Sequence, residues 1–342
     1  MNYETEIAQA REEGYDIIFH RGNDVFAVKS ALWNEQKASE CRRMTGLEAF
    51  RETRGKRRLV FYDPVNWKLR YDGENYWLVY VGKSTMPEQP INASSMYKMF
   101  TETSTAQLDL SSWDMEAVMD AEYAFADNKN VQKICFGEQS MSNLEYAEGM
   151  FKGCANLTEL DLSHWQMVPL RTISRMFSMC ESLINLDVSG IDTSLVVDMV
   201  GVFENMKNLE TLNLANWNIF CVKDLSDLCN GCVILDAFYA PSWAAQSVEH
   251  ADRMFKGCAS LVEIDIQGWN PILMVSAEEM FAGCQCLECL NLDYWKVFNL
   301  NKDLVMTNAW EGCGLLSEGM IHRYDAVSLL KGLIQQAKHD VY

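Results

Sequence analysis

An internal repeat of 26 residues is the feature that most constrains the fold of this chain. A phenylalanine, or a residue in its place, recurs with this spacing along more than half of the sequence. The positions are Phe100, Phe125, Phe151, Phe177, Phe203, Cys229, Phe255, Phe281 and Trp310. The first interval is 25 residues, the next six are 26 and the last is 29. Such a period is typical of proteins in which each unit packs only against its neighbours and the core forms by stacking.

Two further columns of residues share this period. Cysteine follows the phenylalanine position by three residues, at Cys154, Cys180, Cys232, Cys258, Cys284 and Cys313. Tryptophan forms the third column, at Trp113, Trp165, Trp217, Trp243, Trp269 and Trp295, with Gln139 and Ile191 in its two gaps. Because a strict period matches a packing position, we expect these columns to be buried. An aromatic platform for a ligand is the alternative interpretation of the tryptophans.

Between the cysteine and tryptophan columns lies a segment that alternates apolar and polar residues. Clear examples are Leu157–Ser163, Leu183–Ser189, Leu209–Leu214, Leu261–Ile266 and Leu287–Leu292. The pattern L-x-x-L-x-L at this period is the signature of leucine-rich repeats. Apolar residues two apart, such as Leu160 and Leu162, point to the inner side of a strand.

The residues before each strand favour a short helix. The segment Tyr146–Cys154 has helical spacing of its apolar residues and is expected to end near Gly153. A short helix followed by a strand in every unit predicts an α/β solenoid, which is a leucine-rich-repeat-like right-handed superhelix with one parallel sheet. About nine units, with strands about 4.8 Å apart, give a sheet roughly 40 Å long.

Two stretches carry a resemblance to a known family. Residues Met150–Trp165, with the sequence MFKGCANLTELDLSHW, resemble the 26-residue repeat of BspA-like surface proteins and Mycoplasma-type lipoproteins. The segment Asp192–Met199 resembles the turn of the same repeat. The resemblance covers about residues 92–316, where several columns agree at once. It implies a leucine-rich-repeat-like fold, a role in binding proteins or host surfaces, and a location at the cell surface or outside the cell.

The rest of the chain is expected to flank and cap the repeats. The predicted divisions are a small α+β domain at 1–86, a linker at 87–91, the solenoid at 92–322 and a C-terminal capping helix at 323–342. The last segment has one apolar stripe, and a partner-binding helix is its alternative interpretation. The first domain is expected to act as a cap or docking platform, with a separate partner-binding domain or an enzyme as alternatives.

The non-repeating first part combines helix and strand patterns. It predicts helices over 4–13 and 35–51, a hairpin within Asp16–Val28 that turns near Gly22-Asn23, and strands over 58–62 and 76–81.

Charge is distributed unevenly along the chain. The formal net charge is -19, from 29 Lys+Arg and 48 Asp+Glu. Residues 1–90 hold 14 basic and 14 acidic residues, so the remaining balance of 15 − 34 = −19 lies entirely in 91–342. An acidic repeat region repels nucleic acid and anionic membranes. We therefore expect a protein partner, with a basic one favoured, and no direct nucleic-acid binding by the solenoid.

Cysteine spacing by itself suggests zinc or redox chemistry. Cys229 and Cys232 match C-x-x-C, and Cys284, Cys286 and Cys289 lie even closer together. The repeat register, however, places Cys229 in the phenylalanine column and puts Cys289 on the outward face of the strand, so the thiols do not converge. We expect no metal and no cofactor, and cysteines that serve as small apolar fillers.

Outward strand positions vary between repeats and are the candidate partner-binding residues. They are Asp109, Glu159, Asp161, Asp187, Asn213, Tyr239, Glu263, Asp265 and Asn291. Neighbouring aspartates such as Asp161 and Asp187 would repel each other by about 1 kcal/mol in water. The alternatives are that these residues brace the turns as part of the repeat pattern, or that they form a ladder of calcium sites.

Catalytic motifs are lacking in the sequence. His20 near Asp24 and Cys41 is the one loose constellation, and no spacing rule supports it. The basic cluster Arg54, Lys56, Arg57 and Arg58 is expected to be a solvated turn or to dock on the acidic repeats, with phosphate contact as the alternative. We thus expect a non-enzymatic protein–protein interaction scaffold. An acidic inhibitor that mimics nucleic acid, or an enzyme in the N-terminal domain, are the alternatives.

The start of the chain bears on location. Residues Met1–Ile7 are polar and acidic, unlike a signal peptide. The sequence also contains no run of about 20 apolar residues, so it predicts no membrane span. These features predict a cytoplasmic protein, whereas the resemblance implies the cell surface.

Overall fold

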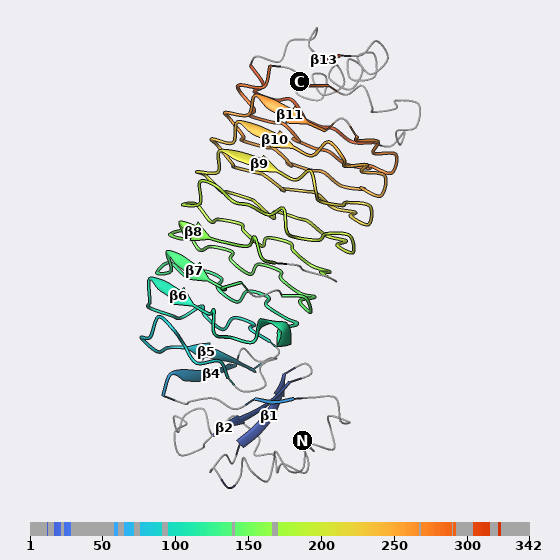
Figure 1. Cartoon of the computed structure of the whole chain (residues 1–342). Coiled ribbons are helices and arrows are strands. Elements are labelled where there is room, and N and C mark those ends of the chain that lie inside the picture. Colours follow the sequence, from blue (N-terminus) through green and yellow to red (C-terminus); the bar gives the residue numbers. More distant parts are fainter. Residues whose placement is uncertain are drawn as a thin grey trace.

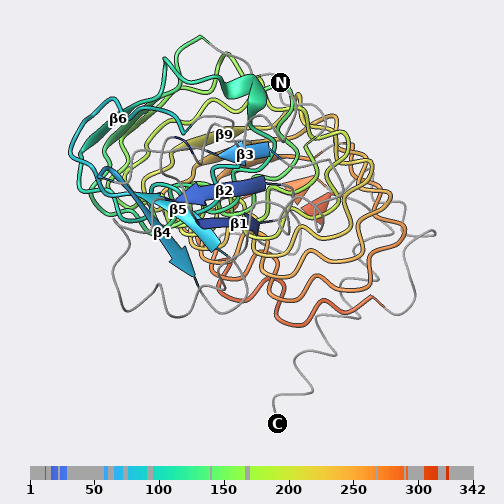
Figure 2. The ribbon, with the colours of Figure 1, turned by 90° about the horizontal axis from the view of Figure 1, so that it is seen from below.

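Repeat units stack one above another along the molecule (Figure 1). The computed structural model describes residues 12, 17–21, 24–28, 58–60, 65–71, 76–90, 95–138, 141–165, 170–266, 268–288, 290–291, 304–314 and 321–322. We call each repeat unit a rung. Seen end-on, the rungs lie over one another with a steady displacement, so that the stack twists (Figure 2).

One side of the stack is a continuous column of backbone contacts, which we call the turn ladder. Parallel bridges join its residues in order: Ser95, Asp120, Tyr146, Thr172, Asp198, Asp224, His250, Ser276 and Val305. In the turns that follow each bridge, N–H groups alternate between two kinds of partner. Tyr123 and Phe125 donate to Glu148 O and Met150 O of the next rung, at 2.8 and 2.9 Å, whereas Ala124 donates to Ala121 O within its own rung, at 3.1 Å. The alternation satisfies the buried backbone without a helix.

The predicted helix in each unit is wrong for the part of the chain that the structure describes. Residues 147–154 form overlapping turns, with φ of +55° at Gly149 and +72° at Gly153. Left-handed residues four apart cannot belong to one right-handed helix. Overlapping turns also bring residues three and four apart to one side, which reproduces the apolar spacing of a helix. Among described repeat residues, the one helical element is the 3-10 turn η2 (Met115–Ala117).

The opposite side of the stack carries short parallel strands. They are β6 (Gln107–Asp109), β7 (Lys133–Cys135), β8 (Glu159–Leu160), β9 (Thr211–Asn213), β10 (Ala237–Tyr239), β11 (Glu263–Asp265) and β12 (Leu290–Asn291). Strands β6–β8 form one sheet and β9–β11 another, while β12 pairs with β13 (Ile321–His322). The expected single sheet is therefore interrupted.

The interruption falls on the segment Leu183–Ser189, which forms no strand. Asp161 and Asp187 lie at equivalent positions of neighbouring rungs there, and the charge of Asp161 acts against the Ser189 hydrogen bonds that favour ionisation of Asp187. Like charges opposite each other destabilise strand pairing, which gives a physical reason for the break.

Within the described residues, the three repeating columns are buried in one continuous core, as predicted, except that Trp310 and Cys313 in the last described rung are only partly buried against it. Rings of the phenylalanine column stack with small interplanar angles: Phe125 to Phe151 is 5.4 Å and 8°, and Phe151 to Phe177 is 5.6 Å and 8°. Cys229 leaves a gap in this stack, and Phe238 packs against Phe255 beside it at 4.9 Å. Trp295 and Gln139 lie outside the described residues.

The N-terminal part contains two strand pairs. Strands β1 (Ile17–Arg21) and β2 (Asp24–Val28) form the predicted hairpin, and β3 (Arg58–Val60) pairs in parallel with β2. Strand β4 (Trp67–Tyr71), which was not predicted, pairs with β5 (Tyr76–Tyr80). The expected helices at 4–13, 35–51 and 323–342 lie outside the described residues, apart from Glu12, which is helical.

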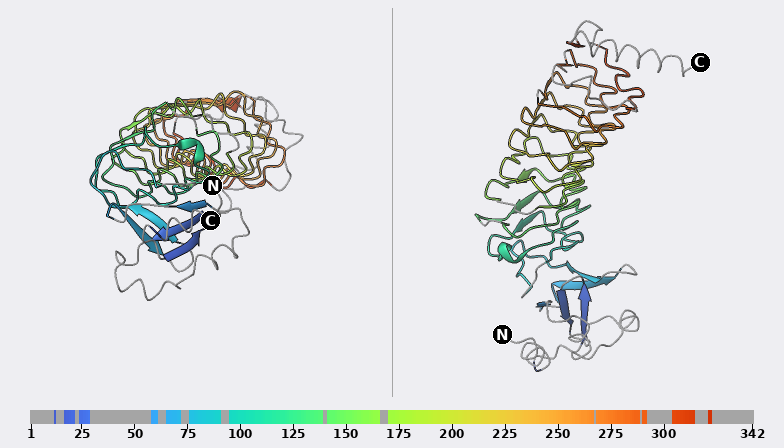
Figure 3. Two further views of the ribbon diagram at one scale, coloured as in Figure 1. Left: turned by 60° about the horizontal axis from the view of Figure 1, so that its bottom comes forward. Right: turned by 90° about the vertical axis from the view of Figure 1, so that its right-hand side faces the viewer.

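The β4–β5 hairpin is the first layer of the stack (Figure 3). Trp67 and Tyr80 are buried in the same core as Phe100, and Tyr80 N donates to Met99 O at 2.8 Å. Residues 87–90 of the expected linker also pack on the first rung, where Trp113 Nε1 donates to Pro87 O at 2.7 Å. The domain boundaries at 86 and 91 stay predictions. Across the described residues, no helix has the length and apolarity needed to traverse a bilayer.

Candidate functional site

The predicted contact residues lie on the strand-bearing side of the stack, which we call the strand face. Strand register brings three of them into one row: Tyr239 of β10 pairs with Asn213 of β9 on one side and with Asp265 of β11 on the other. Glu263 starts β11, where it pairs with Ala237 of β10, and Ala237 pairs in turn with Thr211 of β9. The structure thus gathers four candidates on β9–β11.

The remaining candidates lie outside the sheet formed by β9–β11. Asp109 ends β6 and Glu159 starts β8 in the other sheet, whereas Asp161 follows β8 and Asp187 lies in no strand. Asn291 lies in β12, and its side chain is outside the described residues.

Several of the predicted side chains close the turn that follows the strand. In each of them, the side-chain Oδ1 accepts a hydrogen bond from the backbone N–H of the residue two positions later. The pairs are Ser111 N to Asp109 (3.0 Å), Ser163 N to Asp161 (2.9 Å), Ser189 N to Asp187 (2.9 Å) and Ala215 N to Asn213 (3.0 Å). This local bond is the bracing role that the repeat pattern suggested. The side chains still face solvent, but their identity is constrained by the turn.

These turn hydrogen bonds also stabilise the charged carboxylates. The hydroxyl and N–H of Ser111 lower the pKa of Asp109, and the N–H and hydroxyl of Ser163 lower that of Asp161. The pKa of Asp187 is lowered by Ser189, with the nearby charge of Asp161 acting in the opposite direction. The strand face therefore remains anionic well into acidic conditions.

Tyr239 does not close a turn in this way, because of the residue that follows two positions later. The residue two positions later is Pro241, which has no N–H, so an aspartate or asparagine at position 239 would have no donor to accept from. The Tyr239 hydroxyl instead donates to Glu263 Oε2 at 2.9 Å, and this bond raises the pKa of the phenol. Asp236 and Asp265 add negative charge around the ring.

Asp236 was missed as a candidate because it precedes its strand rather than occupying an outward strand position. The parallel register is the signal that places it beside Glu210 and Val262, since Asp236 N donates to Glu210 O and Val262 N to Asp236 O, both at 2.9 Å. Asp236, Tyr239, Glu263 and Asp265 are named the Tyr239 group below.

A positive charge on the strand face is already paired. Lys133 on β7 forms an ion pair with Glu159 on β8. The basic residues Arg54, Lys56 and Arg57, as well as Cys41, lie outside the described residues, and Arg58 begins β3. His20 and Asp24 lie on β1 and β2, where His20 pairs with Val25 and Asp24 with Arg21.

The cysteine column is explained by hydrogen bonding as well as packing. Each thiol donates to a backbone carbonyl of the preceding rung at 3.0–3.1 Å: Cys154 to Phe125, Cys180 to Phe151, Cys232 to Phe203, Cys258 to Cys229, Cys284 to Phe255 and Cys313 to Phe281. Asn128 fills the same place in an earlier rung and donates to Phe100 O at 2.6 Å.

Burial keeps the inner thiols protonated. It raises the pKa of Cys154 to about 12 and that of Cys180 and Cys258 well above the ordinary range. A protonated thiol is neither a metal ligand nor a nucleophile. In the described part of the chain, no three His, Cys, Asp or Glu side chains are grouped to hold a metal ion.

The repeats match a known protein family. Its model, described as "Mycoplasma protein of unknown function, DUF285", matches residues 94–212 and 197–313, which together span more than half of the chain. The chain belongs to this family. The predicted resemblance to Mycoplasma-type repeats is thereby confirmed.

Solved structures add only weak likenesses. A leucine-rich repeat protein from Eubacterium ventriosum is 16% identical with a TM-score of 0.36, covering 80% of this chain and 55% of its own. The chain thus spans little more than half of that protein's length. A leucine rich cell surface protein from Faecalibacterium prausnitzii is 13% identical with a TM-score of 0.27, covering 75% and 93%. No curated protein matches significantly.

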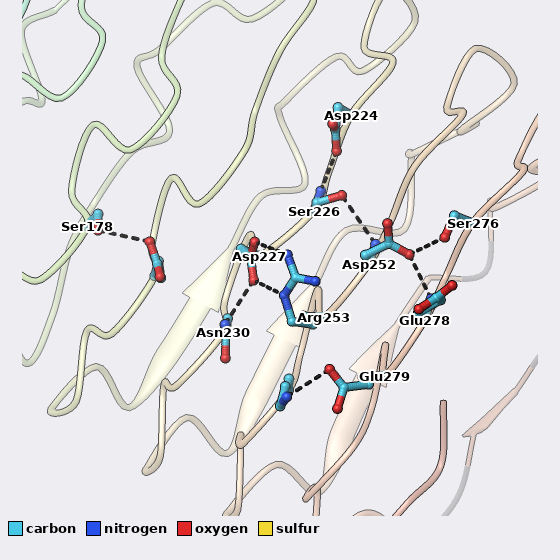
Figure 4. Close-up of polar contacts among 12 residues, drawn as sticks. Ser178, Asp224, Ser226, Asp227, Asn230, Asp252, Arg253, Ser276, Glu278 and Glu279 are labelled. Carbon is cyan, nitrogen blue, oxygen red and sulfur yellow. Dashed lines mark hydrogen bonds and ion pairs between the residues drawn. The ribbon is translucent and has the colours of Figure 1, made fainter. Parts of the chain in front are cut away.

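The turn ladder of this DUF285 chain carries a second polar surface (Figure 4). Arg253 binds both oxygens of Asp227 at 2.8 Å, and Asp252 accepts from the Ser276 hydroxyl and from Glu278 N. Lys256 pairs with Glu279 at 2.8 Å. Each of these contacts joins neighbouring rungs, so the network works to hold the stack together.

Proposed function

We propose that this chain is a non-enzymatic leucine-rich-repeat solenoid that binds a cationic protein or peptide on the strand face. The Tyr239 group is the observation that carries the proposal. Its central side chain is released from the turn-closing role by Pro241, and it stands partly exposed among three carboxylates. Tyrosine supplies large contact area at low entropic cost, and carboxylates select for Lys and Arg.

The charge distribution supports a cationic partner. Several described cations pair with carboxylates of a neighbouring layer or rung, as in Lys133–Glu159, Lys207–Glu181 and Lys223–Glu249. These pairs cancel the positive charges locally, and the excess of acidic residues in the repeats sets the field. A negative field steers a basic partner to the surface and raises its association rate.

A peptide-binding experiment tests the proposal on the full-length chain. The probes are a lysine- and arginine-rich peptide and its counterpart with glutamate at the basic positions. The double variant Asp236→Asn/Glu263→Gln should weaken binding of the basic peptide by about tenfold, because two carboxylates that would meet its cations are lost.

The matched control removes the same charge elsewhere. Glu116 and Glu311 are exposed residues of η2 and the turn ladder, so Glu116→Gln/Glu311→Gln should change affinity by less than about twofold. Equal losses in the two double variants would mean that binding follows total charge and not the Tyr239 group. Tyr239→Ala should weaken binding further without changing stability.

The acidic composition also favours a second candidate function, occupation of a basic groove as a nucleic-acid mimic. The repeats hold the whole net charge of -19, and the strand face remains ionised at acidic pH. A mimic predicts that affinity for a nucleic-acid-binding protein falls steeply with salt and that DNA competes for it. Binding that depends on Tyr239 and little on salt would favour the peptide-binding function.

A further inference from the structure

The last thiol of the cysteine column differs from the others in exposure. Cys154, Cys180, Cys232, Cys258 and Cys284 are fully buried, whereas Cys313, in the last described rung, is only partly buried. Oxidation of a cysteine requires access to the thiol and some thiolate character. Because of its position in the stack, Cys313 is therefore more accessible to an oxidant than the other five thiols of the column.

Cys284 lies directly beside Cys313 in the neighbouring rung. The two rungs are held in register by bonds from Phe281 N to Ala309 O at 2.8 Å and from Gly283 N to Glu311 O at 2.6 Å. The rings of Phe281 and Trp310, three residues before each cysteine, stack at 4.8 Å. Backbones this close, about 5 Å apart, fall in the range of Cα separations that disulfides span.

The two side chains also interact with each other. Interaction with the adjacent Cys284 thiol lowers the pKa of Cys313, whereas interaction with Cys313 together with burial raises the pKa of Cys284. The exposed member of the pair is thus the one whose thiolate is favoured. Cys154 and Cys180 are an internal comparison, because they occupy the same column in adjacent rungs but burial raises the pKa of both.

We propose that Cys313 and Cys284 form a peroxide-sensitive thiol pair that closes to a disulfide at the C-terminal end of the described stack. The Cys313 thiolate attacks one oxygen of hydrogen peroxide, which gives a sulfenic acid and hydroxide. The Cys284 sulfur then attacks the Cys313 sulfur, the S–S bond forms, and the leaving hydroxide takes the Cys284 proton. Two thiols lose two electrons in total, and peroxide is reduced to two molecules of water.

The modification would link the rung at 277–288 to the rung at 304–314 covalently. Formation of the bond removes the two S–H donors that now reach Phe255 O and Phe281 O. The inference concerns a different surface from the Tyr239 group and does not depend on the proposed binding function.

Peptide mapping of the native full-length chain tests the pair directly. The protein is treated with hydrogen peroxide, and the remaining thiols are alkylated under denaturing conditions. We expect a Cys284–Cys313 cross-linked peptide, while Cys154 and Cys180 stay alkylatable and oxidise at least about tenfold more slowly, since they react only when the core opens. Loss of Cys313 to a sulfinic acid, or its linkage to another cysteine, with Cys284 still free, would overturn the proposal.

Two single variants separate the pair from general thiol chemistry. Cys313→Ser should leave Cys284 alkylatable after peroxide treatment, because no partly exposed thiol remains next to it in the cysteine column. Cys180→Ser is the matched control, since it removes an equivalent thiol donor from the column yet should leave the Cys284–Cys313 cross-link unchanged. A cross-linking yield that falls equally in both variants contradicts the assignment, and the wild-type map decides the question if a variant fails to fold.

Discussion

The turn ladder and the strand face run along the same stack but differ in regularity. The turn ladder is bridged in every rung from Ser95 to Val305, and its turns lie over the phenylalanine and cysteine columns. The strand face is broken between β8 and β9, and its outward side chains change from rung to rung. The comparison indicates that stability depends mainly on the regular side, which leaves the strand face free to acquire a specific surface.

The largest expected effect is a cavity under the turn ladder. Phe177 is fully buried and stacks between Phe151 and Phe203 at 5.6 and 5.8 Å. Phe177→Ala should lower the free energy of unfolding by about 3–5 kcal/mol, because it removes the ring and leaves a void. Thr211→Ala on the exposed side of β9 should cost less than about 1 kcal/mol. Urea unfolding followed by tryptophan fluorescence measures both, and similar losses would break the comparison.

The next effect concerns a buried amide of the cysteine column. Asn128 donates to Phe100 O and accepts from Asn130 N and Val131 N at 2.9 and 3.1 Å. Asn128→Ala should cost about 2–3 kcal/mol, since it leaves buried backbone groups unsatisfied.

The control for this variant is an exposed asparagine with the same kind of bond. Asn156 Nδ2 donates to Lys129 O at 2.6 Å, but at the surface, where water replaces the lost donor. Asn156→Ala should cost less than about 1 kcal/mol. Equal costs in denaturant unfolding would show that burial of the column contributes nothing beyond the bond itself.

A smaller effect, with a pH signature, is expected on the strand face. The pKa values of Asp161 and Asp187 are lowered in the folded chain, so these groups add stability above their unfolded pKa of about 3.9. That stability is lost as pH falls through the lower, folded pKa. Asp161→Asn/Asp187→Asn keeps the turn-closing oxygens and removes the charges. When the pH is lowered from 5 to 2, the free energy of unfolding of the double variant should therefore fall less than that of the wild type. The difference should be under about 1 kcal/mol, as expected for exposed groups.

At neutral pH the same double variant loses the charge-assisted turn bonds along with the repulsion between the two carboxylates. Because both pKa values are lowered on balance, it should be neutral or slightly destabilising. Glu311→Gln on the turn ladder removes one exposed charge and serves as the control. An unchanged pH dependence in the double variant, measured by urea unfolding, contradicts the role assigned to the Ser163 and Ser189 hydrogen bonds.

The buried columns were predictable because packing repeats with the sequence period. Phe151, Cys154 and Trp165 occupy core positions as their spacing indicated. The backbone beneath them was not predictable in the same way. Apolar residues at Ala147, Met150, Phe151 and Cys154 fit a helix and also fit overlapping turns, and the positive φ values at Gly149 and Gly153 decide between them.

The sequence predicted which residues lie on the strand face, but it did not predict which of them are free of a structural role. Outward strand positions are visible from alternation, and the predicted strand-face residues whose side chains are described are all exposed or partly exposed. What the alternation does not reveal is that Asp109, Asp161 and Asp187 close turns, whereas Tyr239 precedes a proline and does not. The proline was visible in the sequence, and its missing N–H is the signal that distinguishes Tyr239.

The smallest expected effect is the difference in coupling energy between one ion pair on the turn ladder and one on the strand side of the stack. Arg253 and Asp227 on the turn ladder form a two-point contact at 2.8 Å, with 41% and 16% of the side chains exposed. Lys207 and Glu181, near the start of the strand segments, form a single contact at 2.7 Å with 51% and 40% exposed. Double-mutant cycles with Arg253→Gln/Asp227→Asn and Lys207→Gln/Glu181→Gln should give coupling energies of about 1 and about 0.3 kcal/mol. Asn tolerates the φ of +59° at position 227, so the cycle reports the pair and not backbone strain. A larger coupling for Lys207–Glu181 would place the stabilising contacts between rungs on the strand side and reverse the comparison.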